Sequence, residues 1–243
     1  MLAAGTTTVT VTEIQKHWTY PWQIRPFSRR VLDQAPPQVL IVPSKFPPPA
    51  AIYTSGDKRL GLALSALQIV VNAWNFHLHT RVIQNGPLPP GAYDFIASLP
   101  AGNAAALQQE IERRFGVVVR RETLVTNVLA LTVTNPNAPG LKRAENRRSE
   151  VRLEPGGVTV VNLPLADFLT DYLEFNCEQP VLDQTGLPGN FDCIDFKLDE
   201  ATHQKGQRPD LARLNQALTT QLGLELVPTN LPVEFLVIGK AGD

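Results

Sequence analysis

Two acidic residues, Asp183 and Asp192, enclose a glycine-rich turn in the stretch DQTGLPGNFD. Two carboxyl groups in different environments can serve as a general acid and a general base, which would make this stretch an active-site loop. An earlier stretch, QNGPLPPGAYD, repeats the order of Leu-Pro, Gly, aromatic residue and Asp. Asp192 recurs there as Asp94, so it fits a structural hydrogen bond to the turn backbone. Asp183 is replaced by Gln84, and it is therefore the acid that could have a role of its own.

His77 and His79 lie two positions apart in the stretch FHLHTRV. On a strand this spacing places both imidazoles on one face, where they would supply half of a metal site. An exposed polar edge is the alternative, because only His17 and His203 remain and no cluster of Cys and His completes a ligand set. The sequence also lacks the local motifs of serine hydrolases, zinc proteases, P-loop proteins and dinucleotide-binding proteins. We therefore predict no metal, no cofactor and no catalytic residue.

Cys177 and Cys193 are the two cysteines of the chain, too few for a disulfide framework. They fall in neighbouring predicted elements, so the spacing permits one bridge. The alternative is a pair of buried thiols that pack as small hydrophobic side chains.

A row of aromatic and cationic residues stands near the N-terminus. Residues of this kind usually pack on their own domain, but Trp, Tyr and Arg also dominate protein interfaces. The threonine-rich stretch TTTVTVTEI before them alternates as a strand does, and such a strand could add to the sheet edge of a neighbour. We therefore expect a protein partner, or self-association, through an N-terminal arm. The residues are Trp18, Tyr20, Trp22, Arg25, Arg29 and Arg30.

The composition excludes several functional classes. With a net charge of -1 over 243 residues, the chain lacks the basic excess of a protein that binds nucleic acid. The GLPG of the later turn has the form of a loop that clamps nucleic-acid backbones, but it contains no Lys or Arg. No apolar stretch reaches the roughly 18 to 20 residues of a transmembrane helix. The start MLAAGTTTV has no complete signal peptide, so the chain is cytosolic or a trimmed form of an exported protein.

The elements that position these residues occur twice. The stretch RFGVVVRRETLVTNVLALTV aligns without a gap with QLGLELVPTNLPVEFLVIGK, which pairs Gly116 with Gly223. Before each glycine an apolar pattern of helical spacing predicts an amphipathic helix, and the glycine is its C-terminal cap. After each glycine we expect two strands. Each repeated turn joins two further strands, and a helix and a short strand precede it.

These elements predict an α+β fold of two tandem βαββαββ repeats. Each repeat would be a small mixed sheet with two helices on one face, and an extended N-terminal arm would precede both. The predicted divisions are the arm (residues 1–36), the first repeat (37–135), a polar Pro/Gly-rich connector (136–156) and the second repeat (157–243).

Several stretches resemble a soil-associated bacterial family of unknown function. QPVLDQTGLPGNFD and LNQALTTQLGLELVPTNLPVEFLVI resemble its C-terminal signature, and YDFIASLP, LQQEIERRFG and NAPGLKRA resemble its central segments. The resemblance covers the chain from Pro37 onward. It implies an exported protein, periplasmic or secreted, at the cell envelope, and some members are joined to sensor-type membrane metallopeptidases or to thioredoxin-like domains. The element order is also similar to that of the short N-terminal domains of secretins and TonB-dependent receptors.

Two functional hypotheses follow. The first is a non-enzymatic extracytoplasmic module for protein–protein interaction or assembly. The alternative is a small-ligand binding protein or a hydrolase that uses the cleft between the two repeats. Its site would then contain Asp183, Asp192, His77 and His79.

Overall fold

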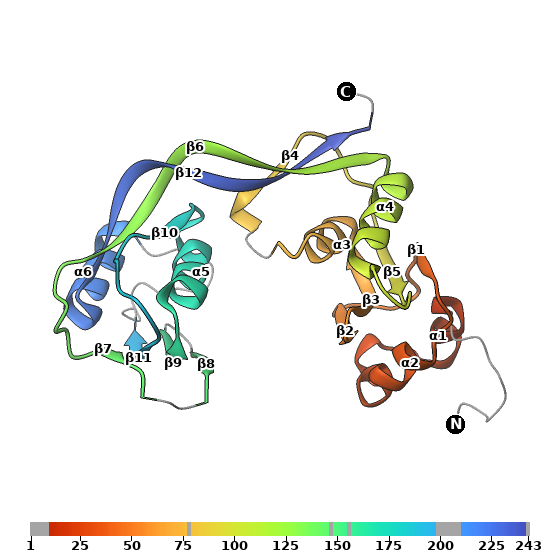
Figure 1. The fold of residues 1–243 in the computed structure, drawn as a ribbon, viewed down its shortest axis with the longest axis horizontal. Coiled ribbons are helices and arrows are strands. Elements are labelled where there is room, and N and C mark those ends of the chain that lie inside the picture. The colour runs from red at the N-terminus through yellow and green to blue at the C-terminus, as the bar shows by residue number, and fades with distance from the viewer. Residues whose placement is uncertain (1–9, 77–78, 146–147, 155–156, 198–209, 242–243) are drawn as a thin grey trace. The chain divides into compact units, whose positions relative to one another are not determined.

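The computed structural model describes residues 10–76, 79–145, 148–154, 157–197 and 210–241. Contacts divide the chain into two compact units (Figure 1). Unit 1 comprises Met1–Glu122 and Leu236–Asp243, and unit 2 comprises Thr123–Phe235. The chain passes between the units twice, once inside strand β6 (Val117–Val133) and once inside strand β12 (Leu224–Lys240).

Unit 1 contains a four-stranded antiparallel sheet with two helices on one face (Figure 1). A capping box of Ser65 and Gln68 begins the first helix, and Gly116, in the left-handed region at φ 66°, ends the second. Their apolar residues pack with Phe95 and other side chains of the sheet in one hydrophobic core. In spatial order the strands are β1 (Val39–Pro43), β5 (Ala92–Ala97), β3 (Lys58–Ser65) and β2 (Ala51–Ser55), and the helices are α3 (Ala66–Ala73) and α4 (Asn103–Phe115).

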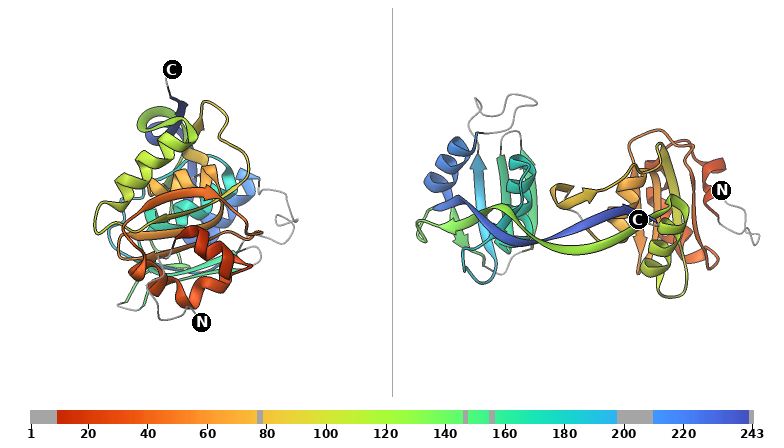
Figure 2. Two further views of the ribbon diagram at one scale, coloured as in Figure 1. Left: turned by 90° about the vertical axis from the view of Figure 1, so that its right-hand side faces the viewer. Right: turned by 90° about the horizontal axis from the view of Figure 1, so that it is seen from above.

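The arm covers the other face of this sheet, as Figure 1 and Figure 2 show. The predicted extended arm is wrong for residues 10–36, which form α1 (Val11–His17), the 3-10 helix η1 (Pro21–Phe27) and α2 (Ser28–Gln34). The Thr10 hydroxyl accepts a hydrogen bond from the Glu13 N–H at 3.2 Å and so caps α1. A second hydrophobic core forms between the arm and the sheet. It includes Val11, Ile14, Ile24, Val31, Leu32, Leu60, Leu62 and Ile96.

Unit 2 repeats the sheet order of unit 1. Its strands β7, β11, β9 and β8 follow one another as β1, β5, β3 and β2 do in unit 1. Two helices pack against the sheet in one hydrophobic core. The elements are β7 (Leu141–Arg143), β11 (Phe191–Lys197), β9 (Gly157–Leu163), β8 (Glu150–Glu154), α5 (Leu165–Cys177) and α6 (Leu211–Leu222).

Each unit contains a further short strand that pairs in parallel with a long one. Strand β4 (Val82–Gln84) pairs with the end of β12, and β10 (Val181–Asp183) pairs with the later part of β6. The last strand of the first predicted repeat, the later part of β6, therefore lies in unit 2 and pairs with β10. The last strand of the second predicted repeat, the end of β12, lies in unit 1 and pairs with β4. The prediction of two strands after each glycine is wrong, because β6 and β12 are each continuous over 17 residues.

The α+β class predicted from the sequence is confirmed. The units have other bounds than the predicted repeats, because the long strands pass from one unit into the other. The division into 37–135 and 157–243 stays a prediction. In the part of the chain that the structure describes, no helix has the length and apolarity to cross a membrane.

Candidate functional site

Asp94 is fully buried in β5 and holds a β-bulge in the neighbouring strand β3. The register shifts between Gly61 and Leu64, so that two residues of β3 lie opposite Asp94 alone. One of them, Ala63, has a left-handed backbone with a φ of 57°. Its N–H donates a hydrogen bond of 2.7 Å to Oδ1 of Asp94. The carboxylate thus satisfies a backbone group that the bulge removes from the strand ladder.

Asp192 does the same in unit 2. The register of β9 against β11 shifts at this residue, and Asn162 has a φ of 55°. The Asn162 N–H donates to Oδ1 of Asp192 at 2.9 Å, and Asp192 is 3% exposed. The two aspartates bind backbone, as the sequence suggests, but their donors lie on the neighbouring strand rather than in the turn.

The arm adds a second bond to Asp94. Nε2 of Gln15, in α1, donates to Oδ2 of Asp94 at 2.5 Å and to the Pro43 carbonyl oxygen at 2.9 Å. The buried carboxylate of unit 1 therefore joins β3, β5 and the arm.

Asp183 lies at the end of β10 and organises its own turn. Its Oδ1 accepts hydrogen bonds from the N–H of Thr185 at 2.8 Å and from the Thr185 hydroxyl at 2.6 Å. That hydroxyl in turn accepts from the Leu187 N–H at 3.2 Å. In unit 1 the corresponding Gln84 donates to the Gly86 carbonyl oxygen at 2.8 Å. Gln84 and Asp183 thus each begin the turn of their own unit. Asp183 bonds to its own turn, whereas Asp192 bonds to strand β9.

The proposed pair of His77 and His79 stays a prediction. His77 lies outside the described residues, and His79 begins the 3-10 helix η2 (His79–Arg81) rather than a strand. Within the described ranges, no group of three or more His, Cys, Asp or Glu side chains could hold a metal ion.

An exposed aromatic surface lies on the arm, and we call it the arm patch. The rings of Tyr20 and Trp22 stack at 5.7 Å with an interplanar angle of 17°, and they are 42% and 57% exposed. The guanidinium of Arg30 lies 5.6 Å from the ring centre of Phe27, which is also exposed. The patch comprises Tyr20, Trp22, Arg25, Phe27, Arg29 and Arg30.

Trp18 is not part of the arm patch, because it packs against the core beneath the arm. Sequence reasoning missed Phe27, although it lies between the arginines that the prediction named. Tyr20 lies in the loop before the 3-10 helix η1, and Trp22 lies in η1.

The comparisons with known proteins identify a family. The sequence model described as a protein of unknown function (DUF3738) matches residues 68–241. The chain belongs to this family. Neither the comparison with curated proteins nor that with solved structures gives a match. The matched segment of this DUF3738 protein includes both buried aspartates and excludes the arm.

Cys177 and Cys193 of the DUF3738 protein form no disulfide with each other. Cys193 is buried and packs in the core of unit 2, so it behaves as the small hydrophobic side chain of the second alternative. Burial, and next the charge of Asp192, raises the pKa of Cys193 to about 12. Since the thiolate is the reactive form, Cys193 is not a nucleophile at neutral pH.

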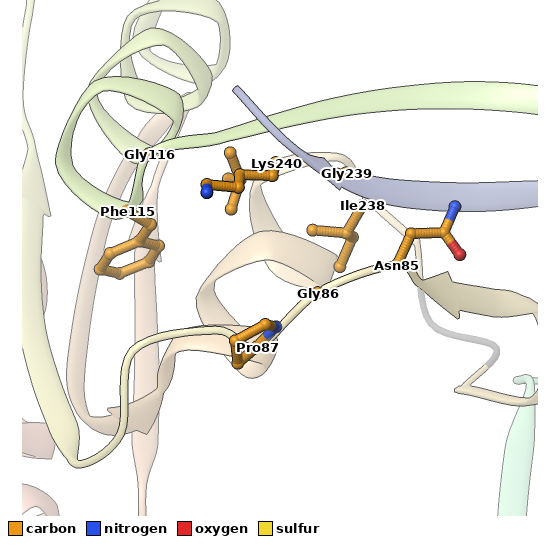
Figure 3. A pocket seen from close by; sticks show the side chains of 9 residues that line it. Asn85, Gly86, Pro87, Phe115, Gly116, Ile238, Gly239 and Lys240 are labelled. Carbon is orange, nitrogen blue, oxygen red and sulfur yellow. The ribbon is translucent and has the colours of Figure 1, made fainter. Parts of the chain in front are cut away.

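The DUF3738 protein has a cavity of about 310 Å³ in unit 1, shown in Figure 3. The loop after β4, the C-terminal end of α4 and the end of β12 enclose it, and we call it the Gly116 cavity. A second cavity, of about 280 Å³, lies between α3 and the edge strand β2. The Gly116 cavity is lined by Asn85, Gly86, Pro87, Phe115, Gly116, Val117, Ile238, Gly239 and Lys240.

Proposed function

We propose that this protein is a non-enzymatic, extracytoplasmic module for protein–protein interaction, and that the arm patch is its docking surface. The observation that carries the proposal is the exposure of three large aromatic side chains beside three arginines on one folded segment. Tyr, Trp and Arg supply most of the binding energy at protein interfaces. Large apolar side chains that gather on a surface are also typical of docking sites.

The arm presents this surface on a fixed backbone. The inner side chains of the arm, such as Ile14 and Ile24, are fully buried against the sheet. The Tyr53 hydroxyl donates a hydrogen bond of 2.9 Å to the Pro21 carbonyl oxygen and ties η1 to strand β2. Binding would therefore not need to order the segment, and the entropy loss on association is smaller.

The charges of the patch indicate the kind of partner. Arg25, Arg29 and Arg30 are all exposed, and Arg30 lies over the ring of Phe27. Asp33 pairs with Arg29 at 3.8 Å, and both side chains are largely exposed, so this ion pair holds Arg29 only weakly. We expect a partner protein with a segment that combines carboxylates with apolar side chains.

The candidate catalytic groups support a non-enzymatic role. The buried carboxylates of Asp94 and Asp192 bind bulge N–H groups, and Asp183 binds its own turn. The extracytoplasmic location is proposed from the family resemblance. The hypothesis of a ligand site or hydrolase in a cleft between the repeats stays a prediction.

The test is capture of a partner from native envelopes, followed by binding of the purified partner. The disrupted variant is Trp22→Ala with Arg30→Glu, and the matched control is Leu153→Ala with Arg213→Glu, an exposed pair in unit 2. We expect the disrupted variant to bind the purified partner at least tenfold more weakly and the control to bind as the unaltered protein does. Equal binding by all three proteins would overturn the proposal. Light scattering on the purified protein would show instead whether the arm patch binds a second copy.

A further inference from the structure

Strand β2 leaves one edge of the unit 1 sheet open (Figure 1). It is the last strand in the order β1-β5-β3-β2, and in the described part of the chain its backbone pairs with β3 alone. A two-residue turn joins the two strands, because Ser55 pairs with Lys58. The pair that flanks such a turn is hydrogen-bonded, and alternate residues before it point their N–H and carbonyl groups away from the partner strand. Thr54 and Ile52 therefore present their backbone groups at the open edge.

The residues of β2 do not protect this edge. Proteins usually protect an open edge with charged side chains, prolines or bulges. The sequence of β2 is AIYTS, without charge, proline or glycine, and its register against β3 is regular. The corresponding edge strand of unit 2, β8, has the sequence EVRLE, in which charged and apolar residues alternate. The edge of β2 is thus suited to accept a further strand, and the edge of β8 is not.

The cavity of about 280 Å³ between α3 and β2 lies beside this edge. Ile52 forms one of its walls and is 40% exposed, whereas Val71 and Phe76 are almost fully buried. The volume is below the usual range of pockets that enclose a whole small ligand, so it suits apolar side chains of a longer chain better. We call the open edge of β2 and this cavity together the β2 groove. The cavity is lined by Ile52, Leu64, Gln68, Val71, Asn72, Asn75 and Phe76.

Amide side chains line the helix side of the β2 groove. Gln68, Asn72 and Asn75 are spaced four and three residues apart, so they follow one face of α3 and its C-terminal end. The oxygen of Gln68 accepts from the Ser65 N–H at 2.8 Å, and its NH₂ group can serve as a donor. An amide side chain forms the same kinds of hydrogen bond as a peptide backbone. An extended chain in the groove would therefore meet backbone groups of β2 on one side and amides on the other.

Two arginines place positive charge at one end of the β2 groove. Nη1 of Arg59 donates to the Asn72 carbonyl oxygen at 2.7 Å, and Nη2 of Arg121 donates to that of Trp74 at 2.6 Å. Both acceptors are neutral carbonyl groups at the C-terminal end of α3, so these bonds do not neutralise either arginine. A segment with a carboxylate at this end of the groove would complement the charge.

The register shows which end of β2 this is. Arg59 lies opposite Thr54, next to the turn into β3. The carboxylate of Asp57, in the same turn, bonds to Asn103 at the start of α4. The acidic residue of a bound segment would therefore lie beside Thr54, and its apolar residues beside Ile52.

We infer that the β2 groove binds an extended segment of a partner protein, which adds to the sheet as a further strand beside β2. Strand addition gains affinity from backbone hydrogen bonds and selectivity from pockets for alternate side chains. The segment would carry apolar side chains at alternate positions, facing the cavity, and an acidic residue at the end that reaches Arg59. The β2 groove has no residue in common with the arm patch, so the inference does not rest on the proposed function.

The test is a titration of the ¹⁵N-labelled full chain with the synthetic peptide ETITITE. This sequence reads the same in both directions, so one probe serves for a strand parallel or antiparallel to β2. We expect the backbone amide signals of Ile52 and Thr54 to shift and that of Val151, in β8, to stay. The peptide KTITITK should bind at least tenfold more weakly, because Arg59 and Arg121 repel its lysines. Equal binding of the two peptides, or no shift at millimolar ETITITE, would overturn the inference.

The first protein variant is Ile52→Glu, which places a carboxylate in the wall of the cavity and repels the acidic peptide. Val151→Glu is its matched control, because Val151 has the corresponding position in β8 and is 38% exposed. The second variant, Thr54→Pro, removes an N–H at the open edge and leaves the bonds to β3 in place.

Binding of ETITITE should fall at least tenfold in Ile52→Glu and in Thr54→Pro, and it should stay unchanged in Val151→Glu. Amide signals outside β2 and β3 show whether each variant keeps its fold. Unaltered binding by both groove variants would contradict the inference. Shifts at Ile52 and Thr54 that depend on protein concentration alone would overturn it in favour of a second copy.

Discussion

The sheets of the two units have the same strand order, but different kinds of residues lie on their outer faces. The outer face is the one turned away from α3 and α4 in unit 1, and from α5 and α6 in unit 2. In unit 1 that face presents Leu60, Leu62 and Ile96, which the arm buries. In unit 2 the register places Thr159 and Val161 at the positions of Leu60 and Leu62. Among the described residues, hydrophobic cores thus lie on both faces of the first sheet and on one face of the second.

The edge strands differ in the same way. Tyr53 of β2 pairs with Leu60 and packs under the arm, whereas Arg152 of β8 pairs with Thr159 and is exposed. Residues directly opposite on antiparallel strands share a face. The comparison teaches that the arm is a structural layer of unit 1, required by an apolar face, and that its outer side is exposed.

The largest expected effect is that of removing the arm. Deletion of residues 1–36 exposes an apolar sheet face and removes at least five buried side chains, each worth about 1.5–3 kcal/mol. We expect unit 1 to lose its cooperative unfolding transition, while unit 2 keeps its own. All three tryptophans, Trp18, Trp22 and Trp74, belong to unit 1, so Trp74 fluorescence reports unit 1 in the deletion variant and circular dichroism reports both units. Two intact transitions in the deletion variant would contradict the structural role of the arm.

The two helix-ending glycines provide the next comparison. Gly116→Ala places an alanine in the left-handed backbone region, with open space around its Cβ atom. It should lower the free energy of unfolding by about 1–2 kcal/mol. Gly223→Ala adds a clash with the Asn135 backbone, and the total loss should exceed about 3 kcal/mol. Urea unfolding of both variants measures the difference. Equal losses would mean that the segment Asn135–Gly140, which packs against Gly223, does not hold the end of α6.

These glycines also show what the sequence can predict. Each follows an amphipathic pattern of helical spacing, and both signals depend on residues a few positions apart. The helices α4 and α6 and the α+β class could therefore be predicted. The course of β6 could not, since RRETLVTN contains neither Gly nor Pro and whether the chain turns there depends on distant pairing partners.

The buried aspartates were predicted in part. Their recurrence after an aromatic residue indicated a structural role, and both carboxylates bind backbone N–H groups. Their donors, Ala63 and Asn162, could not be predicted, because a bulge is defined by the register of two strands that are distant in sequence. The helix α1 was missed because alternating Thr and Val favour a strand locally, and the buried sheet face outweighs this preference.

A smaller effect should distinguish the two aspartates. Asp94→Ala and Asp192→Ala each leave a bulge N–H without its carboxylate, at about 1–3 kcal/mol. Only Asp94 also binds Gln15 of the arm in the structure as described. In a double-mutant cycle, Gln15→Ala should therefore couple to Asp94→Ala by roughly 0.5–2 kcal/mol and add independently to Asp192→Ala. Urea unfolding measures the cycle, and coupling to both aspartates, or to neither, would contradict the link between the arm and the first bulge.

The smallest expected effect concerns Cys193, in unit 2. It occupies the position of Phe95 in unit 1, which does not titrate. Burial raises the pKa of the Cys193 thiol from 9.0 to about 12, so the folded chain holds the proton more tightly than the unfolded chain. The stability that this provides is complete below pH 9 and is lost as the pH rises toward 12. Unfolding of unit 2 should therefore become easier over this range, and Cys193→Val should remove that part of the pH dependence, because valine fills the site without an ionisable group. If the variant and the unaltered chain lose stability in parallel, the thiol does not titrate as its burial requires.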